Sequence, residues 1–353
     1  MSPELEGAPL SPAAAGLSAA DAGKEAAIRL PDPGSRFISL SLDADNQWSY
    51  MKTHGDAGWE ELPSYLDDLV DVALPCFRRH GLTLTVFLVG QDAALDKNRE
   101  ALQAVADAGH EIGNHSFHHE PWLHLYSRPE MEREIGSAHE HIEKATGHGP
   151  VGFRGPGFTF SDDLLRVLTA HGYRYDGSTY PTFLGPLMRA YYFWKSSGFS
   201  EEEKKKRAAL FGSVRDGLRP LNPYIWEVDG KDLVEIPVTT MPLFHTPIHM
   251  SYLLYLATFS RRLMEAYLAT ALKLLSWSGV NPSFLLHPLD FLGGDRVKAL
   301  AFFPGMGLAT EYKLEVFDHI VEATRKAGFQ PVTMRQHAEA AAAGRVPRRR
   351  VGA

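Results

Sequence analysis

The chain has 353 residues, 44% of them hydrophobic and 11% aromatic, and a formal net charge of −7. This apolar content is enough for a large core, and although the length exceeds a typical single domain, (β/α) barrels reach it as one domain. The negative charge argues against a general affinity for nucleic acid or anionic lipid. Cys76 is the only cysteine, so no intrachain disulfide can form, and we interpret it as a small core residue.

Both ends of the chain differ in composition from the middle. Residues 1–34 are rich in Ala, Ser, Pro and Gly and lack a basic stretch followed by an apolar one, so we predict a disordered leader, not a secretory signal. Residues 339–353 predict a loose basic tail with solvated arginines. No segment reaches the ~18 uncharged apolar residues of a membrane span. We therefore expect a cytoplasmic location, with peripheral contact to a membrane as a further option.

Between these ends, buried strands alternate with amphipathic helices. The periodicity predicts, in chain order, a strand at 37–42, a helix at 59–80, a strand at 82–89, a helix at 96–108, a strand near 110–116, a helix at 128–146, a strand at 151–155, a helix at 161–172 and a strand at 173–178. The regularity lapses between about 180 and 230. It resumes with a strand at 233–239, a helix at 251–277, a strand at 282–287, a helix at 311–327 and a last strand near 330–334.

This alternation predicts an α/β fold with a parallel sheet. We expect a single irregular βα barrel over residues 35–338, with a long insertion at about 181–231 after the fifth strand. Active sites of such barrels form where the strands end. Chemically active residues occur at those predicted ends, namely Asp43, Asp45, His115, His119, Arg154, Asp176 and His287.

Two of these groups have the spacing of a metal site. His115 and His119 are four residues apart, so one helical turn or a tight loop can direct both to one ion. Asp43 and Asp45 are two apart, so an extended segment points both carboxylates the same way. Two histidines and one carboxylate form an open metal site, and a second carboxylate is a natural base for water. The same ligands also suit a non-haem iron oxygenase, although the α/β pattern disfavours that alternative.

The remaining polar residues suggest supporting roles. Arg154 can brace a carboxylate and hold it ionised, although a barrel-end ion pair is an equally good interpretation. Pro156 and Gly157 impose a turn that can direct backbone N–H groups inward, where they would stabilise an oxyanion. His287 ends an apolar strand. It is either a hydrogen-bonded core residue or, opposite a metal site, a general acid.

These motifs resemble, in this order, those of the polysaccharide deacetylases, the NodB-homology or carbohydrate esterase family 4 enzymes. The resemblance covers about Phe37 to Met334 and rests on Asp43-Ala44-Asp45, His115-Ser116-x-x-His119, Arg154-x-Pro156 and His287. It implies a distorted (β/α)7 barrel that binds one divalent ion and removes the N-acetyl group from an N-acetylamino sugar, releasing acetate. Zn²⁺ is the expected ion, with Co²⁺, Ni²⁺, Mn²⁺ or Fe²⁺ as alternatives.

The resemblance also implies a role for each residue. Asp45, His115 and His119 would bind the metal. Asp43 would be the base, oriented by Arg154, and His287 the acid. Asp176 would tune that acid, with Asp229 and Asp290 as competitors for the same role. Pro156 and Phe158 would contact substrate, the backbone N–H of Phe158 serving as oxyanion donor.

The chain departs from the family pattern at several positions. Ala44 separates two aspartates that are often adjacent, although some branches have an intervening residue, and Phe158 replaces a tyrosine. The tryptophan of the family's fourth motif is absent unless Tyr180 substitutes for it.

The substrate class is the widest question that the sequence leaves open. The insertion carries aromatic residues such as Phe193 and Trp194 beside basic ones, and His245 and His249 lie in an adjacent apolar segment. They either pack as core or form a lip for a lipid or apolar aglycone on the amino-sugar substrate; on the second interpretation Trp194 and His245 bind substrate. A cyclic-amide hydrolase of the allantoinase or imidase type, and a non-catalytic glycan-binding relative, are the alternative functions.

Overall fold

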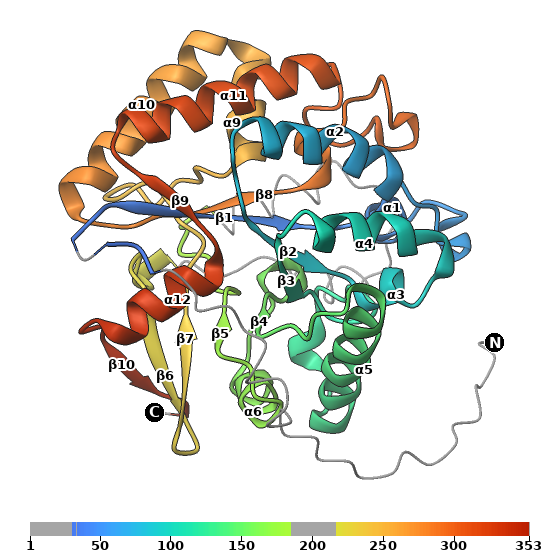
Figure 1. The fold of residues 1–353 in the computed structure, drawn as a ribbon, viewed down its shortest axis with the longest axis vertical. Coiled ribbons are helices and arrows are strands. Elements are labelled where there is room, and N and C mark those ends of the chain that lie inside the picture. The colour runs from blue at the N-terminus through green and yellow to red at the C-terminus, as the bar shows by residue number, and fades with distance from the viewer. Residues whose placement is uncertain (1–29, 33, 185–216, 353) are drawn as a thin grey trace.

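The computed structural model describes residues 30–32, 34–184 and 217–352, in which strands and helices alternate (Figure 1). The strands are β1 (Phe37–Asp43), β2 (Thr85–Leu88), β3 (Glu111–Asn114), β4 (Gly152–Phe153), β5 (Tyr175–Asp176), β6 (Tyr224–Val228), β7 (Lys231–Glu235), β8 (Ser283–Leu286), β9 (Gln330–Val332) and β10 (Arg348–Arg350). The helices are α1 (Gln47–His54), α2 (Leu66–Arg79), α3 (Gly90–Ala93), α4 (Arg99–Asp107), α5 (Arg128–Thr146), α6 (Asp162–Ala170), α9 (Met250–Phe259), α10 (Arg261–Ser278), α11 (Thr310–Lys326) and α12 (Met334–Ala343).

The sheet curls into an irregular barrel. Its strand order is β10-β6-β7-β5-β4-β3-β2-β1-β8, with β9 also paired to β1, and every pair is parallel except the β6–β7 hairpin. The segment after β7 continues toward β8 without regular strand geometry. Val238 N–H donates to Thr179 O at 2.9 Å, and Thr239 N–H donates to Ser283 O at 3.1 Å. Strands β1 to β5, β7 and β8 thus form a distorted (β/α)7 barrel, which confirms the predicted fold class.

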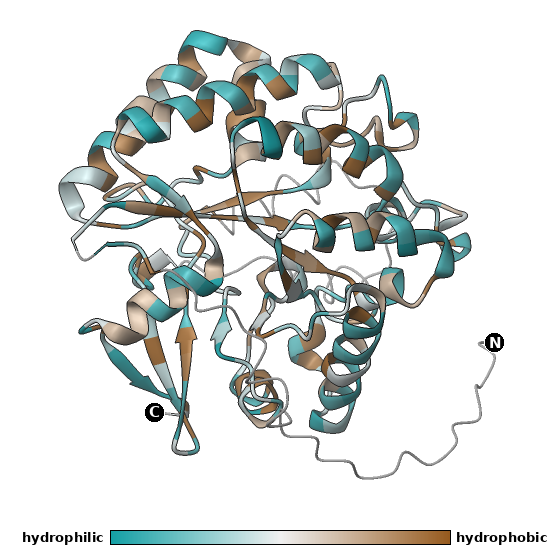
Figure 2. Cartoon of the chain, in the orientation of Figure 1, coloured by the Kyte–Doolittle hydropathy of each residue, from teal (hydrophilic) through white to brown (hydrophobic). Residues whose placement is uncertain are grey.

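The helices surround the barrel with their apolar faces inward. Figure 2 shows hydrophobic strands at the centre and hydrophilic colour on the outer faces of the surrounding helices. On α2, for example, Leu69, Ala73, Cys76 and Phe77 are buried, so Cys76 is a core residue as predicted. No helix in the described part of the chain is long and apolar enough to cross a membrane.

Two predicted helices are each divided. The region 59–80 contains a short 3₁₀ helix, Trp59–Glu61, and then α2, because Pro63 lies between them and cannot donate a backbone hydrogen bond. The region 251–277 contains α9 and α10. Ser260 has extended dihedrals there, and its side chain accepts the N–H of Leu263 at 3.4 Å as an N-cap.

The predicted loose tail over residues 339–353 is wrong for the residues that the structure describes. Helix α12 runs to Ala343, and β10 then pairs in parallel with β6. Arg348 contacts Glu227 at 2.7 Å and also Asp232, both on the β6–β7 hairpin. The acidic hairpin therefore attracts the basic tail and offers it a free sheet edge. Nearly all of the predicted leader and most of the insertion lie outside the described residues.

Helix α12 makes stability depend on pH through His337. Its Nδ1 lies 2.9 Å from Ser39 Oγ, and burial lowers the pKa of the ring to about 3. An unfolded histidine titrates near pH ~6.5. The folded state therefore disfavours protonation of His337. The contribution of the neutral ring to the free energy of unfolding is fully present above pH ~6.5 and is lost as pH falls toward 3, by up to roughly 1.4 kcal/mol per pH unit.

We predict that His337→Phe weakens the decline in the free energy of unfolding between pH 6.5 and 4, measured by urea denaturation at several pH values. His148 is exposed, so His148→Phe is the matched control and should leave the pH dependence unchanged. Equal pH dependence in wild type and His337→Phe would show that another group causes the acid sensitivity.

Candidate metal centre and active site

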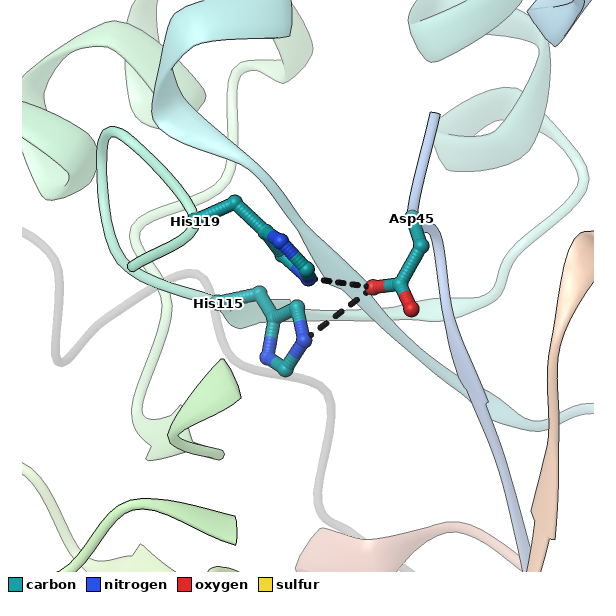
Figure 3. A group of neighbouring side chains, drawn as sticks. All are labelled: Asp45, His115 and His119. Atoms are coloured by element: carbon teal, nitrogen blue, oxygen red, sulfur yellow. Dashed lines mark hydrogen bonds and ion pairs between the residues drawn. The ribbon is translucent and has the colours of Figure 1, made fainter. Parts of the chain in front are cut away.

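Three predicted ligands meet at the carboxyl ends of β1 and β3. Asp45 follows β1 by two residues, and His115 directly follows β3. Asp45 Oδ1 lies 2.8 Å from His119 Nε2 and 3.2 Å from His115 Nε2 (Figure 3). One ligand atom from each of the three residues lies within 4.8 Å of the others. The structure therefore brings together Asp45, His115 and His119, as the sequence predicts.

The chemistry of these donors fits a divalent ion. His115 Nδ1 lies 2.6 Å from Arg154 O, an acceptor, so Nδ1 carries a proton, and Nε2, which faces Asp45, is the nitrogen left for an ion. Burial alone would raise the pKa of Asp45, but the charges and hydrogen bonds of His119 and His115 lower it well below its usual range. Two imidazole nitrogens and one carboxylate are the donor set of an open zinc site.

A tight loop, not a helical turn, presents the two histidines. Ser116 and His119 have positive φ values of 62° and 52°, which only a strongly held loop imposes on such residues. Glu134 of α5 accepts the backbone N–H groups of Phe117 at 3.1 Å and His118 at 3.0 Å, and also bonds the His118 ring. The third histidine of this cluster, His118, is therefore turned toward Glu134 and is not a ligand.

We predict that Glu134→Ala weakens metal binding by ~10- to 100-fold, the range for groups that orient metal ligands. Its hydrogen bonds fix the loop, so their loss adds an ordering cost to every binding event. Metal affinity is measured by competition with a chromogenic chelator. Glu132→Ala is the control, because Glu132 lies on the same helix and is exposed. Unchanged affinity in Glu134→Ala would show that the loop holds its shape without Glu134.

The second carboxylate of the β1 end is held by a buried arginine. Arg154 Nη1 donates to Asp43 Oδ1 at 2.7 Å and to Ser41 Oγ at 2.8 Å, and its Nε donates to Gly177 O at 3.0 Å. Arg154 is fully buried and Asp43 is 4% exposed. A guanidinium at this distance fixes the position of the carboxylate. Asp43 is thus a carboxylate two residues from the candidate metal ligand Asp45, a position that would suit a base for water.

The candidate acid, His287, lies at the end of β8. Its Nδ1 lies 3.2 Å from Ser251 Oγ and 3.8 Å from Asp290 Oδ2, and Asp290 also accepts the His287 backbone N–H at 2.7 Å. Asp290 is the only carboxyl group within 4 Å of this ring among the described residues. Asp229 is an exposed hairpin residue 3.7 Å from Arg166. Of the three aspartates considered for this role, Asp290 is the neighbour of His287.

Asp176 corrects a prediction. It was expected to tune His287, but its Oδ1 accepts the Ser178 hydroxyl at 2.5 Å, and its strand register places it opposite Glu235. The reason is long-range pairing, because β5 and β7 are adjacent although the whole insertion separates them along the chain.

Comparisons with known proteins identify the family of this chain. The family model for polysaccharide deacetylases matches residues 56–175. A peptidoglycan deacetylase of Helicobacter pylori is 30% identical over 204 residues, covering 55% of this chain and 66% of that protein. The chain belongs to the polysaccharide deacetylase family, carbohydrate esterase family 4. The peptidoglycan-N-acetylmuramic acid deacetylase of Bacillus subtilis is 31% identical over 120 residues, covering 34% of this chain and 42% of that protein.

The chain thus spans slightly under two thirds of the first of these relatives and less than half of the second. A solved structure assigned to the polysaccharide deacetylases, from Mycobacterium smegmatis, superposes with a TM-score of 0.57 at 18% identity. The superposition covers 91% of this chain and 95% of that one, so the two share a fold.

One expected feature of the site differs. Phe158 N–H was predicted to bind the oxyanion, but it donates to Gly155 O at 3.0 Å. Gly157 and Phe158 have φ values of 60° and 61°, and with the buried Pro156 they form a tight turn. This N–H is therefore already used within the turn, and its role as the oxyanion donor stays a prediction.

The two residues predicted to form a substrate lip receive little support. His245 Nδ1 lies 3.1 Å from Pro181 O, and its ring centre is 4.9 Å from that of Phe183. Its side chain thus helps to hold the start of the insertion. Trp194 lies outside the described residues.

An aromatic wall continues from Phe158 to the candidate acid. The Tyr180 ring centre lies 4.7 Å from that of Phe158 and 6.1 Å from that of His249, which is 6.3 Å from His287. Burial and the nearby His287 lower the pKa of His249 to about 3, so its ring is neutral. Within the described ranges, the Tyr180 hydroxyl and His249 Nδ1 are buried without a partner.

Two tyrosines of this site escaped sequence reasoning. The Tyr65 hydroxyl donates to the backbone oxygen of Asp45. The pKa of Tyr50 is raised well above its usual value, chiefly by burial and then by Asp45. Both tyrosines precede α2 in a region whose apolar spacing indicates only helix packing, so no local signal marks them.

Proposed function

We propose that this polysaccharide deacetylase is a metal-dependent hydrolase that removes the N-acetyl group from an N-acetylamino sugar of a glycan, releasing acetate and a free amine. The observation that carries the proposal is the convergence at one barrel end of three metal donors, an arginine-held carboxylate and a strand-end histidine. The two curated relatives are named for the deacetylation of peptidoglycan, which supports an amino-sugar substrate.

The base in this proposal is Asp43. When bound by Asp45, His115 and His119, a divalent ion supplies Lewis-acid polarisation and lowers the pKa of water. Asp43 accepts a proton from the attacking water as the water oxygen bonds to the acetamide carbon. Arg154 orients Asp43 through its hydrogen bond, and because Arg154 is fully buried, the surrounding side chains hold it in place.

The acid in this proposal is His287. It donates a proton to the amine nitrogen as the carbon–nitrogen bond breaks. Ser251 and Asp290 orient its ring from the Nδ1 side, which leaves Nε2 for the substrate. His249, kept neutral by burial, does not compete as a proton donor and is free to bind a sugar hydroxyl.

A cyclic-amide hydrolase would use the same base and metal donors, so the two reactions are separated by their products. We expect acetate from N-acetylglucosamine oligomers or muropeptides, measured with the purified zinc-loaded protein, and no ring opening of cyclic ureides. Ring opening without acetate release would replace the proposal with the alternative. Failure on both panels in a metal-loaded protein would support a non-catalytic glycan-binding role.

The finer predictions rest on the sequence alone. An apolar aglycone or lipid on the substrate depends on Phe193 and Trp194, both outside the described residues. Zinc as the native ion and a cytoplasmic location likewise stay predictions.

A further inference from the structure

Two carboxyl groups lie side by side in the barrel interior, next to the residues that orient the candidate base. Asp176 and Glu235 are direct neighbours in the register of β5 and β7, and both are 0% exposed. Directly opposed residues of paired strands point to the same face of the sheet, so the two carboxyl groups lie beside each other. Arg154 is the nearby cation, but its donors are directed to Asp43, Ser41 and Gly177 O.

Two adjacent carboxylates in a dry site cannot both stay ionised without a cation between them. The hydrogen bonds indicate which group is protonated. Glu235 Oε1 accepts from Thr179 N at 3.0 Å and Thr179 Oγ1 at 2.7 Å, and Oε2 accepts from Trp226 Nε1 at 3.0 Å. Such donors favour an ionised carboxylate.

Asp176 has the complementary arrangement. Its Oδ1 accepts from Ser178, while its buried Oδ2 has no donor in the described part of the chain. A proton on Oδ2 would satisfy that atom by donating to Glu235. Burial, and next the charge of Glu235, raise the pKa of Asp176 well above its usual value, which supports this placement.

The pair holds the segment against which Arg154 rests. Asp176 binds the Ser178 hydroxyl, whose oxygen accepts Gly155 N–H at 2.8 Å, and Glu235 holds Thr179 by two bonds. Between them, Gly177 O accepts Arg154 Nε. A Cβ at Gly177 would lie 3.2 Å from Arg154 Nη2, so the segment fits the guanidinium closely.

We propose that Asp176 and Glu235 share one proton, held on Asp176, and that the pair positions Arg154 and thereby Asp43. The proposal rests on the proposed function, because Asp43 matters only if it is the base. It makes Glu235 a positioning residue and gives Asp176 a role behind Arg154 in place of one beside His287.

The test exploits the difference between the two acids. Asparagine at position 176 can accept the Ser178 hydroxyl and donate to Glu235, so Asp176→Asn should keep kcat within ~3-fold of wild type. Alanine can do neither, so Asp176→Ala should misplace Arg154 and lower kcat ~10- to 100-fold. Glu235→Gln should not preserve kcat in the same way. Both carboxylate oxygens of Glu235 accept hydrogen bonds, so the amide NH₂ of glutamine would face another donor, either Trp226 Nε1–H or those of Thr179. We expect ~10-fold or greater loss of kcat there, with KM and metal content near wild type.

A purely structural role predicts a different pattern. Glu111 is a half-buried acid at the opposite barrel end that accepts the Tyr175 hydroxyl at 2.7 Å, so Glu111→Gln is the control and should alter thermal stability without lowering kcat. If Asp176→Asn loses kcat as Asp176→Ala does, or loses one limb of the pH–rate profile, Asp176 acts as a charged partner and the proposal is overturned.

An infrared spectrum tests the proton without relying on activity. Wild type at pH 7 should show the C=O stretch of a buried protonated carboxyl that is absent from Asp176→Asn. Absence of that band from the wild-type difference spectrum would overturn the shared proton. Acetate release by wild type tests the proposed function separately, so an inactive wild type with the band present would reject the function and leave the proton assignment standing.

Discussion

His119→Ala should yield a folded protein that binds its divalent ion at least ~100-fold more weakly than wild type. This loss exceeds the usual effect of removing a group that only hydrogen-bonds to a metal ligand. His119 Nε2 and His115 Nε2 both face Asp45 Oδ1, so removing one leaves two donors for an ion that requires three from the protein. Metal content after gel filtration, measured by mass spectrometry, should fall from about one ion per chain to near zero.

The control for this variant comes from the same loop. His118 adjoins His119 but bonds Glu134, so His118→Gln should keep its metal. Full metal content and full activity in His119→Ala would remove His119 from the site. Loss of metal from both variants would instead indicate a disordered loop.

Asp43→Asn should lower kcat by ~10²-fold or more while metal stays bound, the usual contribution of a positioned base. Asparagine keeps the shape and can still accept from Arg154, so the loss comes from the missing proton acceptor. The charge of Arg154 also loses its partner in a buried site, so we expect lower thermal stability as well.

Two measurements separate the base from a general structural effect. His287→Ala should reduce kcat by a similar ~10²-fold, and each surviving variant should lose a different limb of the pH–rate profile. Asp229→Asn, on the exposed hairpin, should behave as wild type. Near-normal turnover in metal-loaded Asp43→Asn would exclude Asp43 as the base.

Local sequence signals predicted most of the barrel and the inner part of the candidate site. Strands were predicted at 37–42, near 110–116 and at 282–287, and the structure has β1, β3 and β8 there, ending at Asp43, Asn114 and Leu286. The candidate ligands follow the ends of β1 and β3 along the chain, so a parallel barrel is enough to bring them together. The predicted helix over 128–146 coincides with α5, whose Ser127 capping box is a local signal.

Features that depend on distant pairing were not predictable from local patterns. Strand β6 and the paired tail strand β10 require each other's sheet edge and the charges of Glu227 and Arg348. Asp176 has Glu235 as its neighbour only because β7 pairs with β5 across the insertion. The turn at Phe158, with its positive φ, is unfavourable for this residue type and is imposed by its surroundings.

The most direct test of the central claim is a metal titration of acetate release. Metal-free protein is given increasing Zn²⁺, and the initial rate of acetate release from an N-acetylglucosamine oligomer is followed. We predict a negligible rate without metal, a rise in proportion to added ion and a plateau at one equivalent per chain, with no such rise in His119→Ala. Acetate release that is independent of metal, or the absence of acetate at every metal concentration, would contradict the account.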